Sequence, residues 1–312
     1  MQHVIKSIFL FVLFLLGMFC ILIFIHGTFA PEQVNPFKSS YGHLHSRLKE
    51  VKKIENVDIL FLGASRTYRA FDTRIFQKQG YFTFNLGSSA QTPLQTKMLL
   101  KKYITKLNPK LVVFEVNPDT FSSEGVESAL DVINNEQLDS ELVKMVFTIN
   151  HSKAYRNLIY AFEKDLFNLN VNYHQPVKIA EDTYIAGGYV ERNLDFFKKP
   201  QNIQNTTWKS NKKQLEAFNE IISFFKEQNI NYMLVNTPTT QQYYNSLTNR
   251  SEFNNLMKNH GIYYDFNETL QLNDSLCFYD RFHLNQNGVD IFDKEFIDVI
   301  LMNKPLKPTT AP

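Results

Sequence analysis

The chain begins with a long run of hydrophobic residues. Residues 8–25 carry no charge and are almost wholly apolar, and Lys6 stands just before them. This length approaches a bilayer span and exceeds the usual hydrophobic region of a signal peptide. The pattern predicts a membrane anchor over residues 1–30. A removed signal peptide is the alternative, although Pro31 disfavours cleavage after the preceding Thr-Phe-Ala.

Charges near this run bear on its orientation. Basic residues lie on both sides of it, but most of those after it are beyond the near-membrane window, and long domains translocate largely regardless of charge. We therefore expect a short cytoplasmic N-terminus, with the rest of the chain on the extracytoplasmic side. Residues 31–54 are polar and charged, and they predict a stalk that ends in a short helix.

Strand and helix patterns alternate after the stalk. Continuous apolar runs predict three buried strands: 57–62, 81–86 and 111–116. Residues 71–80 predict a short helix ended by Gly80, and Thr92-Pro93 predicts the start of a longer helix that stops at Asn108-Pro109. Strands joined by such helices form a parallel sheet with right-handed crossovers.

The alternation is interrupted between residues 119 and 207. Polar and aromatic residues are mixed there without sustained periodicity, apart from one or two helices expected within 142–167. The aromatic content favours a folded insertion over a disordered loop. We expect this insertion to cap the carboxyl ends of the strands. The later pattern predicts helices at 212–228, 251–260 and 287–302 and strands at 232–235 and 262–266.

These patterns together predict the fold class. It is an α/β domain over residues 55–302, a three-layer αβα arrangement with a parallel flavodoxin-like sheet, preceded by one N-terminal transmembrane helix. Residues 303–312 form a tail. The length of the whole chain, 312 residues, allows one or two domains.

Charge and composition exclude several kinds of partner. The formal net charge is only +2, without a basic patch, which disfavours nucleic acid. No glycine-rich phosphate-binding segment is present, so we expect no nucleotide cofactor. His43 and His45 have no third ligand at suitable spacing, so we expect no metal. Cys20 lies in the apolar run, which makes a disulfide with Cys277 improbable.

Several polar residues follow the expected strands. Ser65, Gly87 and Asn117 come directly after the first three strands, at the edge of a parallel sheet where ligands bind. A serine there is commonly only a helix N-cap. Asp280 and His283 are three residues apart, so a turn can bring the carboxylate to the imidazole. Nucleophilic serine chemistry needs such a pair and donors for the oxyanion.

Four segments resemble, in matching order, the blocks of the SGNH (GDSL-like) hydrolase superfamily: Gly63-Ala64-Ser65, Asn85-Leu86-Gly87, Glu115-Val116-Asn117 and Asp280-Arg281-Phe282-His283-Leu284-Asn285. The resemblance implies that Ser65 is the nucleophile, with His283 and Asp280 as its partners. It also implies that Gly87, Asn117 and the Ser65 amide are the oxyanion donors. Ala64 stands where the family has Asp, and Pro118 interrupts the family's Gly-x-Asn-Asp pattern.

The resemblance also implies a function. Membrane-anchored members of this type add or remove acyl groups on surface glycans, so we expect a serine esterase or O-acyltransferase acting on cell-envelope carbohydrates, with a further envelope protein as acyl donor. A non-catalytic glycan-binding or assembly module with a degenerate site is the alternative. A phosphate site using Arg66 and Arg69 is weaker, because a solvated face explains both residues.

Overall fold

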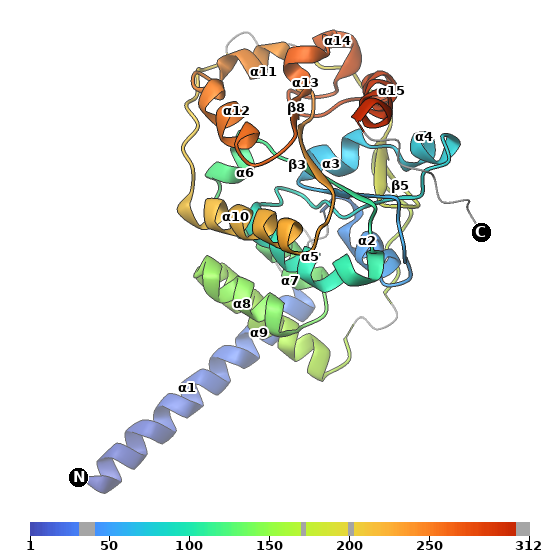
Figure 1. The fold of residues 1–312 in the computed structure, drawn as a ribbon. Coiled ribbons are helices and arrows are strands. Elements are labelled where there is room, and N and C mark those ends of the chain that lie inside the picture. The colour runs from blue at the N-terminus through green and yellow to red at the C-terminus, as the bar shows by residue number, and fades with distance from the viewer. Residues whose placement is uncertain (31–40, 170–172, 199–202, 304–312) are drawn as a thin grey trace.

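A computed structural model describes residues 1–30, 41–169, 173–198 and 203–303 (Figure 1). The first part of the expected stalk, 31–40, and the tail from residue 304 lie outside the described residues. The large sheet consists of β1 (Ile59–Leu62), β2 (Thr83–Asn85), β3 (Leu111–Glu115), β7 (Tyr232–Asn236) and β8 (Tyr263–Asp265). Its order is β2-β1-β3-β7-β8, and every neighbouring pair is parallel. This is the flavodoxin-like order, so the predicted fold class is confirmed.

Helices cover both faces of this sheet. After the N-terminal helix, the helices that precede β7 in the sequence, whether they cover the sheet or lie outside it, are α2 (Leu44–Val51), α3 (Ser65–Ala70), α4 (Thr73–Lys78), α5 (Pro93–Leu107), α6 (Pro118–Ser122), α7 (Val126–Asn135), α8 (Ser140–Ile149), α9 (Ser152–Leu166) and α10 (Lys212–Glu227). Those following it are α11 (Gln241–Ser246), α12 (Arg250–Lys258), α13 (Phe266–Thr269), α14 (Asp274–Cys277) and α15 (Gln286–Asn303). A 3₁₀ turn, η2 (Tyr41–His43), precedes α2.

Side chains along each strand alternate between two hydrophobic cores. One face carries Leu60, Phe114 and Leu234 and packs against α5 and α10. The other carries Phe61 and Val235 and packs against α4 and α15. The strands are buried on both faces, which explains why their sequences are continuous apolar runs rather than alternating ones.

The start of α5 follows its sequence signals. Thr92 is the N-cap and Pro93 the first helical residue, as the sequence predicts, and Thr92 and Gln95 also form a reciprocal capping box. The helix ends at Asn108, whose φ of 38° is left-handed. These local contacts fix where the chain enters and leaves the layer beside the sheet.

Only part of the insertion lies at the carboxyl ends of the strands, whereas the sequence predicted that all of it would cap them. α8 and α9 confirm the helices expected within 142–167, but α7 and α8 pack against the outer side of α5, as an extra layer (Figure 1). Val132 and Val146 are fully buried in this packing. A second sheet of β4 (Lys178–Ile179), β5 (Asp182–Ile185) and β6 (Tyr189–Arg192) was not predicted, and its β6 contacts α3. Only the edges of the insertion therefore reach the carboxyl ends of the strands.

The prediction of a stalk is wrong for residues 41–54, the part of it that the structure describes. Leu44, Leu48 and Val51 are completely or almost completely buried and belong to the core of the domain. They lie on one face of α2 at a spacing of four and three residues, whereas Lys49 is exposed. The lysines suggested a solvated segment because they occupy the outer face of an amphipathic helix.

Arg47 connects α2 to two distant loops. Its guanidinium is fully buried and donates to the carbonyl oxygens of Gly188 (3.0 Å), Gly87 (2.9 Å) and Gly42 (3.0 Å). It also lies 4.5 Å from the centre of the Tyr68 ring. A buried charge is tolerated where its donors are satisfied. Arg47 therefore joins the helix, the loop after β2 and the turn of the second sheet.

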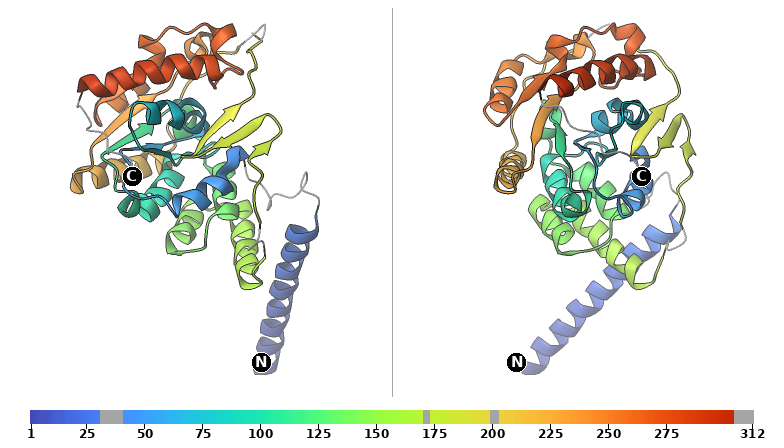
Figure 2. Two further views of the ribbon diagram at one scale, coloured as in Figure 1. Left: turned by 90° about the vertical axis from the view of Figure 1, so that its right-hand side faces the viewer. Right: turned by 45° about the vertical axis from the view of Figure 1, so that its right-hand side comes forward.

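The N-terminal helix confirms the sequence prediction of one long apolar element. α1 (Gln2–Phe29) has a mean hydropathy of 3.3 over its most apolar window and extends away from the domain (Figure 2). It is long and apolar enough to cross a membrane. Cys20 on this helix and Cys277 in α14 are both free thiols.

We predict that Arg47→Met lowers the free energy of unfolding by at least about 2 kcal/mol, because buried carbonyl oxygens lose their donor. Lys49→Met is the matched control on the same helix, since it removes an exposed charge and should change stability by less than about 0.5 kcal/mol. Denaturant unfolding of the detergent-solubilised chain measures both. Equal effects of the two substitutions would contradict the anchoring role of Arg47.

Candidate active site

Ser65 is positioned by the turn after β1. Gly63 has a φ of 139°, and a Cβ there would lie 2.8 Å from the carbonyl oxygen of Glu115. Only glycine fits this conformation and this close approach. The chain turns at once into α3, and Ser65 is the first residue of that helix. Its hydroxyl is consequently presented at the carboxyl edge of the sheet.

Ser65, His283 and Asp280 form a continuous chain of contacts. Ser65 Oγ lies 2.8 Å from His283 Nε2. His283 Nδ1 lies 2.8 Å from Asp280 Oδ2 and 3.0 Å from Oδ1. Residues 218 positions apart in the chain are thus brought into hydrogen-bond contact. The arrangement has the nucleophile, base and carboxylate connectivity of a serine-hydrolase triad.

The loop carrying Asp280 and His283 is held by its own hydrogen bonds. Asp280 Oδ1 accepts from the backbone N–H groups of Phe282 (2.7 Å) and His283 (2.9 Å). The Tyr279 ring stacks on the imidazole, with centres 5.5 Å apart and planes at 8°. Asn285 Nδ2 donates to the carbonyl oxygens of Leu276 and Phe278 and fixes the end of the loop.

The electrostatics favour a neutral imidazole beside an ionised carboxylate. Burial lowers the pKa of His283 below its ordinary 6.5, and the opposing effect of Asp280 does not restore it. Burial would raise the pKa of Asp280, but the hydrogen bond from His283 and two backbone N–H groups leave it below its ordinary value. A neutral imidazole held by a carboxylate can accept the proton of Ser65.

Gly87 does not occupy the place that the resemblance implies. Its N–H donates to Asn85 Oδ1 (3.0 Å), its carbonyl oxygen accepts from Arg47, and it is not among the described residues lining the cleft. The side chain of Asn85 folds back on the turn and takes up the amide. The geometry therefore does not support Gly87 as an oxyanion donor.

Asn117 does lie at the cleft, at the end of β3. Its Oδ1 caps α6 by accepting from Thr120 N (3.2 Å), while its Nδ2 donates to the carboxyl group of Glu115 (3.0 and 3.1 Å). Burial raises the pKa of Glu115, with Arg66 opposing this effect. Glu115 orients Asn117, a role that the sequence did not reveal because its position reads as part of a buried strand.

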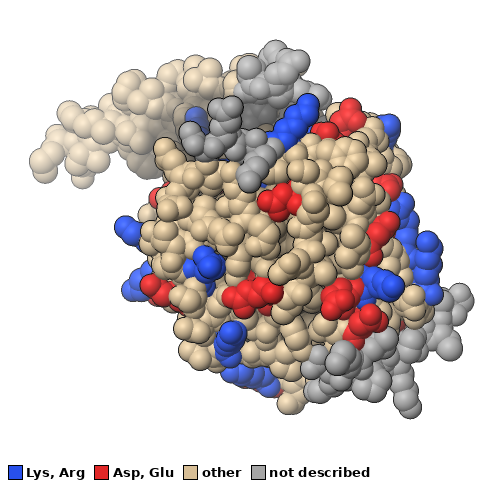
Figure 3. Space-filling model, turned by 90° about the horizontal axis from the view of Figure 1, so that it is seen from above, with Lys and Arg blue, Asp and Glu red and all other residues tan. Residues whose placement is uncertain are grey.

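A cleft of about 660 Å³ opens over Ser65 and His283. Its walls mix aromatic and charged side chains, including Tyr68, Tyr279, Phe282, Arg66, Arg69, Arg192, Asp119, Glu127 and Asp195. Acidic and basic residues are likewise interspersed over the face of the molecule in Figure 3. The cleft offers both hydrogen-bonding groups and ring faces to a ligand, without a single dominant charge.

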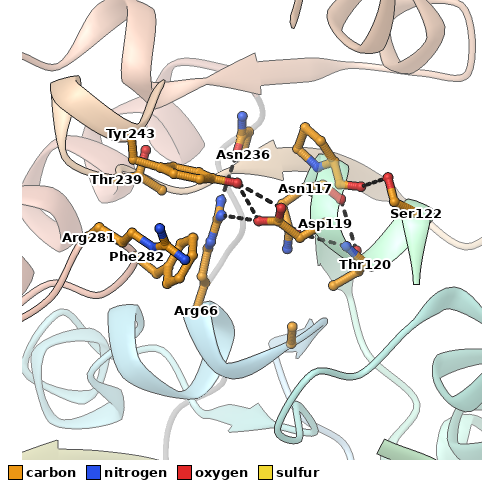
Figure 4. A network of polar contacts seen from close by, with 12 residues as sticks. Arg66, Asn117, Asp119, Thr120, Ser122, Asn236, Thr239, Tyr243, Arg281 and Phe282 are labelled. Atoms are coloured by element: carbon orange, nitrogen blue, oxygen red, sulfur yellow. Dashed lines mark hydrogen bonds and ion pairs between the residues drawn. The ribbon is translucent and has the colours of Figure 1, made fainter. Parts of the chain in front are cut away.

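Arg66 is part of a polar network rather than a solvated face (Figure 4). It is only 5% exposed and donates to Asp119 Oδ2 at 3.0 Å, and Tyr243 Oη donates to the same carboxylate. The expectation of solvation was wrong because Asp119 and Tyr243, which are distant in sequence, meet it from other elements. The ion pair occupies the guanidinium and weakens the case for a phosphate site.

Arg69 is also buried and paired. It forms a bidentate contact with Asp182 of β5 (2.8 and 2.6 Å), and Arg192 of β6 approaches the same carboxylate at 3.2 Å. The Arg192 guanidinium lies 4.9 Å from the Tyr279 ring centre. The second sheet thus contributes to the cleft, which sequence reasoning missed because the small strands carry no clear period.

The cleft has no metal-binding cluster among the described residues. No group of three or more His, Cys, Asp or Glu side chains within the described ranges is placed to hold a metal ion. Three carboxylates at or beside the cleft, Asp119, Asp182 and Asp280, are instead engaged by arginine, tyrosine or histidine.

Comparisons with known proteins give distant similarities. No protein-family model and no curated protein matches the chain. Among solved structures, the chain is similar to an acylhydrolase from Bacteroides fragilis, with 14% identity, 86% of this chain and 100% of that one covered, and a TM-score of 0.40. It is also similar to a GDSL-like lipase from Bacteroides thetaiotaomicron, with 12% identity, coverages of 85% and 100%, and a TM-score of 0.42. Similarities this weak decide neither fold nor function.

We predict that the imidazole of His283 titrates below pH 6.5, because burial disfavours its charged form. Asp280→Asn should lower this pKa further, since the carboxylate stabilises the imidazolium. Histidine ring resonances followed by NMR against pH measure both values, and His283→Gln assigns the signal. A pKa above 6.5 in the parent, or a rise in the Asp280→Asn variant, would contradict this electrostatic description.

Proposed function

We propose that this protein is a serine-dependent esterase or O-acyltransferase that acts on acyl esters of cell-envelope carbohydrates through an acyl-enzyme. The observation that carries the proposal is the contact of 2.8 Å between Ser65 Oγ and His283 Nε2, with Asp280 behind the imidazole. It is supported by the matching order of the four sequence segments. A lone surface serine would need none of these contacts.

The geometry supports a two-step reaction. Ser65 Oγ attacks the acyl carbonyl carbon while His283 Nε2 accepts its proton. The bond to the sugar oxygen then breaks, and His283 returns the proton to that oxygen. Water or a second sugar hydroxyl releases the acyl group from Ser65, with His283 again transferring the proton. Asp280 keeps Nδ1 protonated throughout, so that Nε2 remains the basic nitrogen.

The oxyanion site rests on two donors. The Ser65 N–H is at the first position of α3 and has no partner within that helix. Asn117 Nδ2 carries two hydrogens and contacts both carboxyl oxygens of Glu115, so its role as an oxyanion donor requires that one hydrogen serve that carboxyl group and the other face the cleft. Burial raises the pKa of Glu115, and the nearby Arg66 guanidinium opposes that effect and supplies positive charge on the same side of the site.

The character of the cleft supports a carbohydrate as substrate. Tyr68, Tyr279 and Phe282 supply ring faces, while Asp119, Glu127 and Arg192 supply groups that can bond sugar hydroxyls. α1 supports attachment to a membrane with the domain on the extracytoplasmic side, where a separate envelope protein would deliver acyl groups in the transferase case. Hydrolase and transferase use the same residues and differ in the acceptor.

One observation favours a second candidate, a non-catalytic glycan-binding or assembly module. The N–H of Gly87 is already bonded to Asn85, so the site has one oxyanion donor fewer than the resemblance implies. A binding module would keep its affinity for acylated glycans in a Ser65→Ala variant. An enzyme would lose turnover in that variant.

We predict that a fluorophosphonate probe labels Ser65, because His283 activates its hydroxyl. Ser65→Ala should abolish labelling in the detergent-solubilised chain, as measured by gel fluorescence and peptide mass. Ser89→Ala is the matched control, since Ser89 also lines the cleft but contacts Tyr68 rather than a base. Labelling that persists in Ser65→Ala, or none in a folded parent, would remove the enzyme proposal.

We predict that hydrolysis of small aryl esters rises with pH and reaches half its plateau below pH 6.5. The reactive form has neutral His283, whose pKa is lowered, so activity is lost as pH falls through that pKa. Asp280→Asn should reduce kcat by about 10⁴-fold through the wrong tautomer. The pH profile of kcat/KM measures the first effect. Full activity of Asp280→Asn would exclude the assigned role.

A further inference from the structure

The last turns of α1 pack against α9. Ile23 is 5% exposed and forms a cluster with Tyr160, and the rings of Phe24 and Phe167 meet edge to face at 5.3 Å. A Cβ at Gly27 would lie 2.6 Å from Tyr160 Cζ, so the glycine lets the ring lie directly on the helix backbone. The anchor and the domain therefore share a specific contact.

The remainder of α1 is exposed apolar surface. The helix has 28 residues and is roughly 42 Å long, whereas a bilayer core is about 30 Å thick. A helix that crosses the core over residues 8–25 places Ile23 and Phe24 close to its edge. Whatever packs against these two residues must then lie at the bilayer boundary.

α9 packs against this part of α1, and it carries exposed apolar side chains that suit the bilayer boundary. It contacts α1 where that helix meets the domain, and the two helices cross there (Figure 1). Phe162, Leu166 and Phe167 are 60%, 61% and 59% exposed. Phe162 and Leu166 are four residues apart and so share one side of the helix. We call these three residues the α9 face.

We propose that the α9 face inserts into the boundary region of the bilayer beside α1. The exposed rings continue the contact between Phe24 and Phe167, so the surface is contiguous with the anchor. α2 supports the same arrangement, because its packing into the domain takes Leu44–Val51 out of the segment that was expected to act as a spacer. The occupant of this face is therefore lipid, and the domain rests on the membrane.

Depth-dependent fluorescence quenching tests this proposal. The full chain, with Trp208→Phe to remove its single tryptophan, is reconstituted into phosphatidylcholine vesicles containing lipids brominated on the acyl chains. Phe162→Trp reports on the α9 face. Ile291→Trp on α15, where the native side chain is 46% exposed, is the matched control. We expect brominated lipid to reduce the Phe162→Trp emission at least about twofold and to leave the control nearly unchanged.

Two outcomes would overturn the proposal. If brominated lipid reduces the Phe162→Trp emission no more than the emission of the Ile291→Trp control, the α9 face is not selectively in lipid. Protection of Phe162→Trp from aqueous acrylamide without quenching by brominated lipid would show that protein covers it, as in a second copy of the chain. Leu166→Trp repeats the measurement if Phe162→Trp fails to fold. None of these readouts depends on the reactivity of Ser65.

Discussion

The hydrogen bond between Ser65 and His283 depends on a constraint of the sheet. Parallel strands end at one edge, so the residues after β1 and β3 are neighbours although more than 50 positions separate them. Gly63 then turns the chain so sharply that the next side chains face this edge. The loop at 280–283 reaches the same place because α15 packs on the sheet face beneath it. A shift in strand register would separate the hydroxyl from the imidazole.

Charge pairing around the cleft explains how buried arginines can lie near the imidazole of His283. Arg66 and Arg69 are each held by a carboxylate from a different element, Asp119 and Asp182. Unpaired, these guanidinium groups would lower the pKa of His283 still further and attract anions. Each pair has no net charge, so the ring faces and hydroxyl groups of the cleft remain available to a ligand. A neutral ligand suits such a surface better than an anion.

The features that could be predicted from the sequence are those with local signals. Continuous apolar runs located the strands, and Thr92-Pro93 located a helix start, because these signals are local. The second sheet and the packing of α2 were missed, since both depend on partners far along the chain. Asp280 and His283 were predictable from their spacing. Gly87 was assigned from its place at a strand end and from the resemblance, but neither reveals that the side chain of Asn85 takes up its amide.

The insertion links the membrane side of the molecule to the cleft. Its helix α9 contacts α1, and its strand β6 supplies Arg192 to the wall of the cleft. Arg47 fastens the turn at Gly188 to the loop at Gly87, so the second sheet cannot move without disturbing the turn after β2. With the α9 face in lipid, the cleft is held at a fixed height above the bilayer. For the glycan substrate proposed above, this height sets the distance from the membrane at which an acyl group meets Ser65.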